Sequence, residues 1–330
     1  MDKVKVIAEL ANAHDGKFEK LLHMIFCSKA ADVDFVKFQL FRAKKLVTKN
    51  HPMYSGYLKK EFSEKEWIDI SKYCRSIDLK FFVDIFDDES LKIGDKMKPY
   101  GYKVHSTNLS NPFLLRNIAE KKKPILLGIS GCTDAEIELA INIIREKTNT
   151  EIVLMNGHQN FPTALNETNL KRISTLKNRF KLPVGLQDHI DGYSDMAQIV
   201  PLLGVAMGYS YIEKHFTIDR DTDTISKDYL SSLNREELIK MVKRIKQIPV
   251  VLGDTTLKFT NGELKYRESM KKSIVAKRDI KAGEKITLNN IEFKRGKSLG
   301  LQPDSIHKII DKKATKLIKE DEVICQDMIV

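Results

Sequence analysis

Short apolar segments rich in β-branched residues alternate with amphipathic segments along the first three quarters of the chain. The apolar segments are nearly continuous, as in parallel strands buried on both faces, whereas the segments between them follow the 3.6-residue period of a helix. Eight strands are predicted, at residues 4–12, 35–41, 80–86, 101–106, 124–130, 151–156, 182–188 and 209–216. Predicted helices include residues 17–31, 64–77, 134–147, 169–180, 195–208 and 235–248.

Eight strand–helix units in about 250 residues match the size of a (β/α)8 TIM barrel. The alternative is a doubly wound open sheet, but no Gly-x-Gly-x-x-Gly motif follows the first predicted strand. We therefore predict an α/β protein built on a closed barrel. In such barrels the active site forms at the carboxyl ends of the strands, so polar residues at those ends are the candidates for chemistry.

The pattern changes after Gly253. Residues 1–253 form the predicted barrel, and residues 254–271 are polar without a strong apolar period, which predicts a linker. Residues 272–330 carry short β patterns around a turn at 282–284, which predicts a small β-rich domain. About sixty residues bury only a marginal core, so we expect this domain to dock against another part of the protein.

Composition removes several classes of function. The chain has 56 basic and 45 acidic residues, a net charge of +11, but the basic residues are scattered and no nucleic-acid motif accompanies them. The chain has no apolar run long enough to cross a membrane and no signal-peptide pattern at its start. Its four cysteines are widely spaced. These features predict a cytoplasmic protein that binds neither nucleic acid nor membrane.

Two histidines follow neighbouring strands of the predicted barrel. His189 comes directly after the seventh strand, and His215 lies near the end of the eighth. Because neighbouring strands lie about 4.8 Å apart, the two imidazoles can share a divalent ion that polarises a carbonyl oxygen. The alternative is that one of them is a hydrogen-bonded structural histidine, and the spacing alone does not separate the two.

Two lysines are predicted inside the barrel. Lys37 and Lys103 alternate with apolar neighbours near strand ends, where an unpaired charge would be costly. An anionic ligand would satisfy them, and so would an internal ion pair, for Lys37 with Glu9. We favour the ligand, because both lysines lie near strand ends. Ser130 precedes Gly131 before a predicted helix, which is a weak signal for an anion site.

Several of these segments together resemble the sialic acid synthase family, whose enzymes join phosphoenolpyruvate to an N-acetylated hexose. The resemblance rests on residues 7–16, 36–39, 103–111, 184–189 and 212–217, of which Ile-Glu-Lys-His-Phe-Thr at 212–217 is the most specific. Residues 273–276, 279–284 and 294–296 are similar to the antifreeze-like (SAF) domain that closes these synthases. The resemblance thus spans nearly the whole chain.

The resemblance implies a role for each matching residue. His189 and His215 match the ligands of a divalent ion of the manganese type, and Glu9 and Asp228 match acids beside the sugar. Substrate-binding roles are implied for Lys37, Gln39, Lys103, Ser106, Ser130, Gln159, Gln187 and Arg295. The arginine would enter the active site of a partner subunit, which implies a homodimer with a swapped C-terminal domain.

The chain departs from the family pattern in three places. Residues 156–159 are Asn-Gly-His-Gln where the family has His-Cys-Thr-Ser, and residues 187–189 are Gln-Asp-His where it has Ser-Asp-His. Gln159 and Gln187 thus replace two small hydroxyls of the phosphoenolpyruvate pocket. Gly296 follows Arg295 in place of the usual proline. These changes leave the acceptor sugar open.

The predicted activity is a metal-dependent condensation of phosphoenolpyruvate with N-acetylmannosamine or a related amino sugar, giving a nonulosonic acid and phosphate. One alternative is a metal-dependent aldolase or hydrolase that acts on a sugar without phosphoenolpyruvate. The other is a carbohydrate-binding homologue without catalysis. Retention of both histidines, Glu9 and both lysines argues against the second alternative, because each would be a costly polar group without a ligand.

Overall fold

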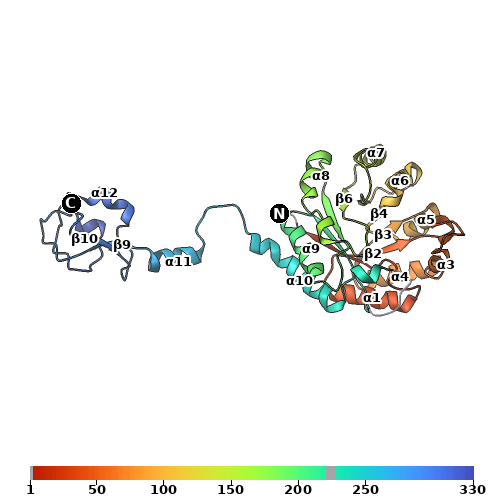
Figure 1. Ribbon diagram of the computed structural model, residues 1–330, viewed down its shortest axis with the longest axis horizontal. Helices are drawn as coiled ribbons and strands as arrows, with labels where there is room; N and C mark the ends of the chain where they lie inside the picture. Colours follow the sequence, from red (N-terminus) through yellow and green to blue (C-terminus); the bar gives the residue numbers. More distant parts are fainter. Residues whose placement is uncertain (1–2, 221–226) are drawn as a thin grey trace. The chain divides into compact units, whose positions relative to one another are not determined.

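The computed structural model describes residues 3–220 and 227–330. The chain folds into two compact units, Met1–Gly253 and Asp254–Val330, and each is described by itself. Figure 1 shows the strands of the first unit at its centre, surrounded by helices.

The first unit is a closed barrel of eight parallel strands that pair in sequence order, so the predicted (β/α)8 fold is confirmed. Strand β8 pairs with β1 and closes the sheet. The strands are β1 (Lys5–Glu9), β2 (Phe35–Leu40), β3 (Lys80–Ile85), β4 (Gly101–Val104), β5 (Ile125–Gly128), β6 (Ile152–Asn156), β7 (Val184–Asp188) and β8 (Tyr211–His215).

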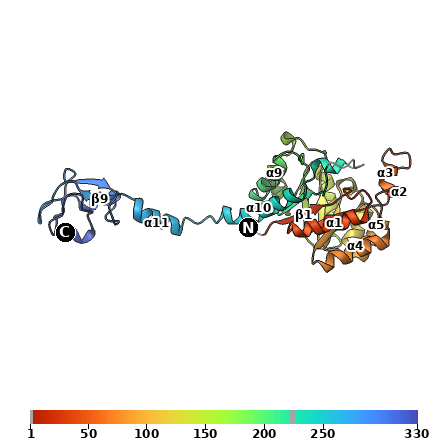
Figure 2. The same ribbon diagram turned by 90° about the horizontal axis from the view of Figure 1, so that it is seen from below.

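Helices surround the barrel on the outside; α1 to α9 lie between consecutive strands, and α10 follows β8. They are α1 (Phe18–Ala30), α2 (Ala43–Leu46), α3 (Tyr54–Leu58), α4 (Glu64–Ser76), α5 (Asp88–Met97), α6 (Pro112–Ala119), α7 (Asp134–Arg145), α8 (Arg172–Phe180), α9 (Met196–Ala206) and α10 (Arg235–Leu252). Capping boxes begin α4, α7 and α10. Helices α1, α4 and α5 are neighbours in this ring (Figures 1 and 2).

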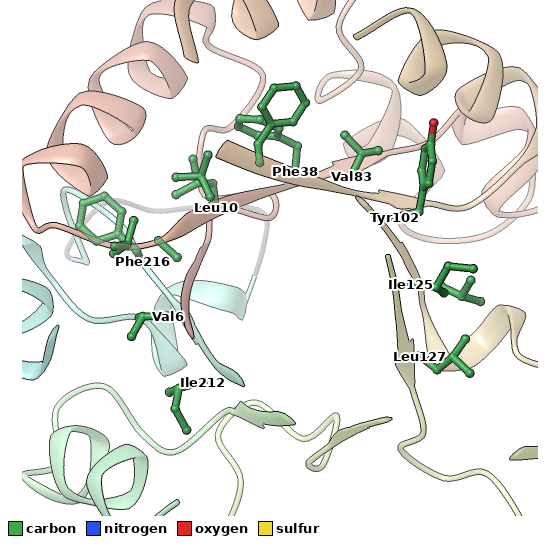
Figure 3. Close-up of a cluster of buried hydrophobic side chains, with 14 of the residues drawn as sticks. Val6, Leu10, Phe38, Val83, Tyr102, Ile125, Leu127, Ile212 and Phe216 are labelled. Atoms are coloured by element: carbon green, nitrogen blue, oxygen red, sulfur yellow. The ribbon is translucent and has the colours of Figure 1, made fainter. Parts of the chain in front are cut away.

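Two apolar layers fix the barrel. The outer layer fills the space between strands and helices, and Figure 3 shows side chains such as Phe38, Val83 and Leu127 pointing from the strands toward the helices. The inner layer fills the barrel interior with Ile7, Phe35, Phe82, Leu126, Val153, Met155 and Tyr211. Because this inner layer closes the interior below, the polar residues gather at the carboxyl ends of the strands.

Several strands end earlier than the sequence pattern predicts. Strand β1 ends at Glu9 rather than at residue 12, because Ala11 adopts a positive φ of 35° and its N–H donates to the Glu9 side chain. Strand β4 ends at Val104 rather than at residue 106, because a 3-10 turn begins at Ser106. The chain leaves the sheet close to the polar residues of the candidate site. The apolar pattern therefore overestimates the length of these strands.

The second unit has its own small core. A two-stranded antiparallel sheet, β9 (Ser273–Ala276) and β10 (Ile291–Lys294), and the short helix α12 (Ile306–Ile309) lie in it. Ala314, Ile318 and Val323 also take part in isolated antiparallel β-bridges, to Ile329, Ile280 and Val275 respectively. The core consists of Ile274, Ala276, Ile280, Ile286, Ile291, Ile309, Ala314, Ile318, Ile324 and Ile329.

The segment predicted as a linker contains the helix α11 (Asn261–Met270). Thr260 and Glu263 form a capping box at its start, a signal that the sequence analysis passed over. The helix buries none of its residues, so its sequence has no periodic apolar pattern from which it could have been predicted. Across the part of the chain that the structure describes, no helix has both the length and the apolar character needed to span a membrane.

Candidate active site

A cavity of about 430 Å³ opens at the carboxyl ends of the barrel strands. The structure brings eight of the predicted site residues to its wall: Glu9, Lys37, Gln39, Lys103, Gln159, His189, His215 and Asp228. They come from β1, β2, β4, β8 and from loops that follow β6, β7 and β8. Residues far apart in sequence therefore share one site.

Buried charges form the floor of this cavity. Lys37 makes a close ion pair with Glu9 and lies 3.3 Å from Glu213 and 3.5 Å from Asp84. Lys103 lies 2.7 Å from the same Glu213 oxygen. All five side chains are at most 3% exposed. The sequence analysis left open whether Lys37 pairs with Glu9 inside the barrel. The structure shows this ion pair, and it shows Asp84 and Glu213 close to Lys37 as well.

Burial and charge set the protonation of this cluster. Burial raises the pKa of Glu9 to about 7, although Lys37 opposes the shift. Burial also disfavours the Glu213 anion, but Lys103 and Lys37 outweigh it and lower the pKa of Glu213 to about 2. Burial lowers the pKa of Lys103. The two lysines thus keep Glu213 ionised, whereas Glu9 titrates near neutral pH.

The two histidines face each other at one side of the cavity. Their ring centroids lie 5.0 Å apart, and Phe161 packs edge-on against His189 at 4.6 Å and against His215 at 5.7 Å. Burial lowers the pKa of His215 to about 3 and holds the pKa of His189 well below its usual value. Nearby positive groups lower the pKa of both rings further. Both imidazoles are therefore neutral, as metal ligands must be.

One further observation indicates that His189 and His215 are suited to bind a metal ion. The Nδ1 atom of His189 is buried and has no hydrogen-bond partner among the described residues, an arrangement that a metal ion would satisfy. Over residues 3–220 and 227–330, no group of three or more histidine, cysteine or acidic side chains is placed to hold a metal. A metal ion bound here would therefore be held by the nitrogen atoms of the two histidines.

A second buried ion pair, between Asp188 and Lys214, connects the two strand ends next to the histidines. Asp188 and Lys214 are register partners on β7 and β8, each directly before one of the histidines, and their side chains meet at 2.7 Å. Lys214 also donates to the carbonyl oxygen of Ile190, which ties the loop after β7 to β8. This pair therefore fixes the strand ends that carry both imidazoles.

Replacing Lys214 with methionine is expected to lower the free energy of unfolding by about 3 kcal/mol, because it leaves a buried carboxylate without its cation. Urea denaturation measures the loss. Lys96→Met is the matched control, since Lys96 pairs with Glu64 at 2.6 Å on an exposed surface and should matter little. Equal losses in the two variants would contradict a special role for the buried pair.

Two predicted residues, Gln187 and Ser130, lie behind the cavity wall and are linked by hydrogen bonds to Lys103, which lines it. Lys103 donates to Gln187 Oε1 at 3.0 Å, and Gln187 Nε2 donates to the Ser130 hydroxyl at 2.7 Å. Ser130 in turn donates to the carbonyl oxygen of Gly157. A Cβ at Gly157 would lie 2.0 Å from the Gln187 carbonyl oxygen, so only glycine fits there. Gln187 thus helps to orient Lys103 together with Glu213, its register partner on β8.

The remaining two predicted residues lie elsewhere. Ser106 begins the 3-10 turn after β4 and is not part of the cavity wall. Arg295 belongs to the second unit, where it follows β10 with an exposed side chain. A Cβ at the neighbouring Gly296 would lie 2.1 Å from Val323, which explains why glycine rather than proline stands there.

The sequence analysis missed several residues of the site. Asp84 was not named, and Glu213 stood at the end of the eighth predicted strand without an assigned role; together they complete the buried charged cluster around the two lysines. Strand parity places both inside the barrel, because each lies two positions after an inward-facing aromatic residue of its strand. The connection between β2 and β3 supplies His51, from a loop, and Tyr57, from the short helix α3, and the sequence carries no signal for either. His105, Phe41 and Phe86 also line the cavity.

Comparisons with known proteins agree with this geometry. The NeuB family model matches residues 24–256, and the SAF domain model matches residues 271–330. The chain is 31% identical to an N,N'-diacetyllegionaminic acid synthase and 31% identical to a pseudaminic acid synthase, both of Campylobacter jejuni. Each alignment covers 98% of this chain, and the two cover 99% and 96% of the respective relatives.

A solved structure supports the same assignment. The N-acetylneuraminic acid (sialic acid) synthetase from Leptospira borgpetersenii, in complex with citrate, matches with a TM-score of 0.73 and 28% identity. The match covers 82% of this chain and 93% of that one.

A closed (β/α)8 barrel with buried charges and a histidine pair at its carboxyl ends has the architecture of an enzyme. The chain belongs to the NeuB family, phosphoenolpyruvate-dependent enzymes that form carbon–carbon bonds in nonulosonic acid synthesis, and it carries the C-terminal SAF domain. The family predicted from the sequence motifs is therefore confirmed.

Proposed function

We propose that this chain condenses phosphoenolpyruvate with an N-acetylated hexose, with a divalent ion of the manganese type bound by His189 and His215. The observation that carries the proposal is the shared cavity, in which two buried lysines and two neutral imidazoles face the same space. Lysines suit the anionic groups of phosphoenolpyruvate, and neutral imidazoles suit a metal ion.

The lysines would hold the donor. Lys37 and Lys103 exchange part of their contact with Glu213 for the carboxylate and phosphate of phosphoenolpyruvate, so that its C3 faces the aldehyde carbon of the sugar. The bound ion supplies Lewis acidity for the aldehyde oxygen. C3 attacks the aldehyde carbon, the aldehyde oxygen gains a proton, water adds at C2, and phosphate leaves with cleavage of the C2–O bond.

Glu9 is the residue best suited to move a proton in this sequence. Its pKa of about 7 lets it donate and accept at neutral pH, and it faces the cavity beside Lys37. Asp228, on the 3-10 turn after β8, also lines the cavity and would bind a sugar hydroxyl.

The acceptor is an amino sugar of the class that the relatives' names indicate, such as N-acetylmannosamine or a diacetamido hexose. The decisive assay incubates the protein with phosphoenolpyruvate, Mn²⁺ and a set of N-acetylated hexoses, and follows phosphate release and product mass. A product that forms without phosphoenolpyruvate would support an aldolase or hydrolase instead. Sugar binding without any product would support a carbohydrate-binding protein.

Replacing Lys103 with alanine is expected to raise the KM for phosphoenolpyruvate at least tenfold and to leave the KM for the sugar nearly unchanged. A charge-assisted hydrogen bond of this kind contributes about 1.5 to 3 kcal/mol. Steady-state kinetics with each substrate varied in turn measure the split. Lys80→Ala, on the exposed start of β3, is the control. A rise confined to the sugar KM would mean that the two substrates are reversed.

We further propose that the protein is a homodimer in which residues 272–330 of each subunit cover the active site of its partner. The match to the SAF domain and the exposed side chain of Arg295 support this arrangement. A guanidinium group can hold a carbonyl or carboxylate of the substrate with paired N–H donors.

A further inference from the structure

His105 lines the cavity, and the proposed mechanism assigns it no role. It lies two residues after Lys103, just beyond the end of β4, and both side chains line the cavity. Because residues two apart in an extended segment point to the same side, both side chains enter the cavity from the same strand, with His105 beyond the carboxyl end of β4. The two residues therefore face the same part of a bound substrate.

The ring of His105 is held in one orientation. It packs against Phe86 with centroids 5.2 Å apart and planes tilted by 32°. Its Nδ1 accepts a hydrogen bond from the backbone N–H of Thr107 at 3.3 Å and lies 3.0 Å from the Thr107 hydroxyl. A backbone N–H can only donate, so Nδ1 is the acceptor and the proton of the neutral ring is on Nε2.

The Nε2–H group is left available. Among the residues that the structure describes, no group accepts a hydrogen bond from it, and the His105 side chain is half-buried at the cavity wall. Burial lowers the pKa of His105, with Lys103 and Lys37 adding to the effect and Asp84 opposing it, so the ring stays neutral. The cavity thus presents an oriented N–H donor next to a buried ammonium group.

We propose that His105 is a further substrate-binding residue, whose Nε2–H donates to the same anionic group of phosphoenolpyruvate that Lys103 holds. This inference rests on the proposed function of the site. A neutral donor beside a cation binds an anionic oxygen with direction as well as charge, and it does so without adding a second positive charge next to Lys103. The Phe86 contact and the Thr107 hydrogen bonds position the ring for this contact.

The test compares two replacements in the full-length protein. His105→Leu removes the donor but keeps an apolar side chain against Phe86, whereas His105→Gln can place an amide N–H near the position of Nε2. Isothermal titration calorimetry measures phosphoenolpyruvate binding without the sugar, and steady-state kinetics measure the KM of each substrate. His23→Leu, on an exposed position of α1, is the matched control.

We expect His105→Leu to weaken phosphoenolpyruvate binding about tenfold and to raise its KM by the same factor, with the sugar KM unchanged. His105→Gln should recover most of the loss, and His23→Leu should bind as the parent does. Unchanged phosphoenolpyruvate binding by His105→Leu would overturn the inference while leaving the proposed function intact.

Two other results would also overturn it. An effect on the sugar KM alone would place His105 against the acceptor. Equal losses in the leucine and glutamine variants, with a lowered unfolding temperature in both, would show that the ring only packs against Phe86. A parent protein that neither binds nor consumes phosphoenolpyruvate would overturn the proposed function itself, and this inference with it.

Discussion

Replacing His215 with alanine is expected to abolish metal-dependent turnover while leaving the barrel folded. His215 supplies one of two neutral imidazoles whose centroids lie 5.0 Å apart, and its loss leaves only His189 as a nitrogen ligand. Without the ion, the developing charge on the aldehyde oxygen loses its main stabilisation, which is worth several kcal/mol in metal enzymes. We therefore expect a loss of at least a thousandfold in kcat/KM.

Mn²⁺ binding by calorimetry and thermal unfolding separate this effect from misfolding. The variant should bind Mn²⁺ far more weakly than the parent and unfold at nearly the same temperature. His307→Ala, an exposed position of the second unit, controls for loss of a histidine in general. A variant that binds Mn²⁺ and turns over like the parent would show that the ion, if required, is bound elsewhere.

The fold of the first unit could be predicted because a parallel barrel imposes a strong pattern on its sequence. Each strand is buried on both faces, so near-continuous apolar runs at 35–41 or 80–86 mark it clearly. The ends could not be predicted equally well, because local features decide them, such as the positive φ of Ala11. In α11 the cap alone marks the helix, since no face of it is buried.

The site could be predicted only in part, for a related reason. Strand parity places Lys37 and Lys103 inside the barrel, but it does not say which carboxylates meet them. That depends on the stagger between strands, which brings Glu213 within reach of both lysines. Residues in the long connection between β2 and β3, such as Tyr57 of α3, reach the cavity through tertiary packing that no local pattern encodes.

The same reasoning bears on Gln187. Its side chain bridges Lys103 and Ser130 behind the cavity, so a larger residue is accommodated without closing the site. The glutamine therefore extends the hydrogen-bond network around Lys103 and does not line the cavity. Under the proposed function, phosphoenolpyruvate binding is retained, and differences from the relatives are expected on the acceptor side.

Deleting residues 272–330, or replacing Arg295 with alanine, is expected to remove most of the turnover while leaving a barrel that binds Mn²⁺. The second unit has a core of its own, so its removal should not unfold the first. Arg295 is exposed at the end of β10 and carries the planar donor pair that lysine cannot replace. Arg295→Lys should therefore recover little activity, and Lys297→Ala, two residues along, is the control.

Complementation decides whether the arginine acts in its own subunit or in the partner. His215→Ala and Arg295→Ala proteins are each inactive by the proposals above, and they are mixed under conditions that allow subunits to exchange. In a swapped mixed dimer, the barrel with an intact histidine pair receives an intact arginine from the other chain, while the second site carries both defects. Activity should then rise toward one working site per mixed dimer, as counted by native mass spectrometry. Mixed dimers that form without recovering activity would rule out the swap, because in that case each active site depends on the arginine of its own chain or on neither.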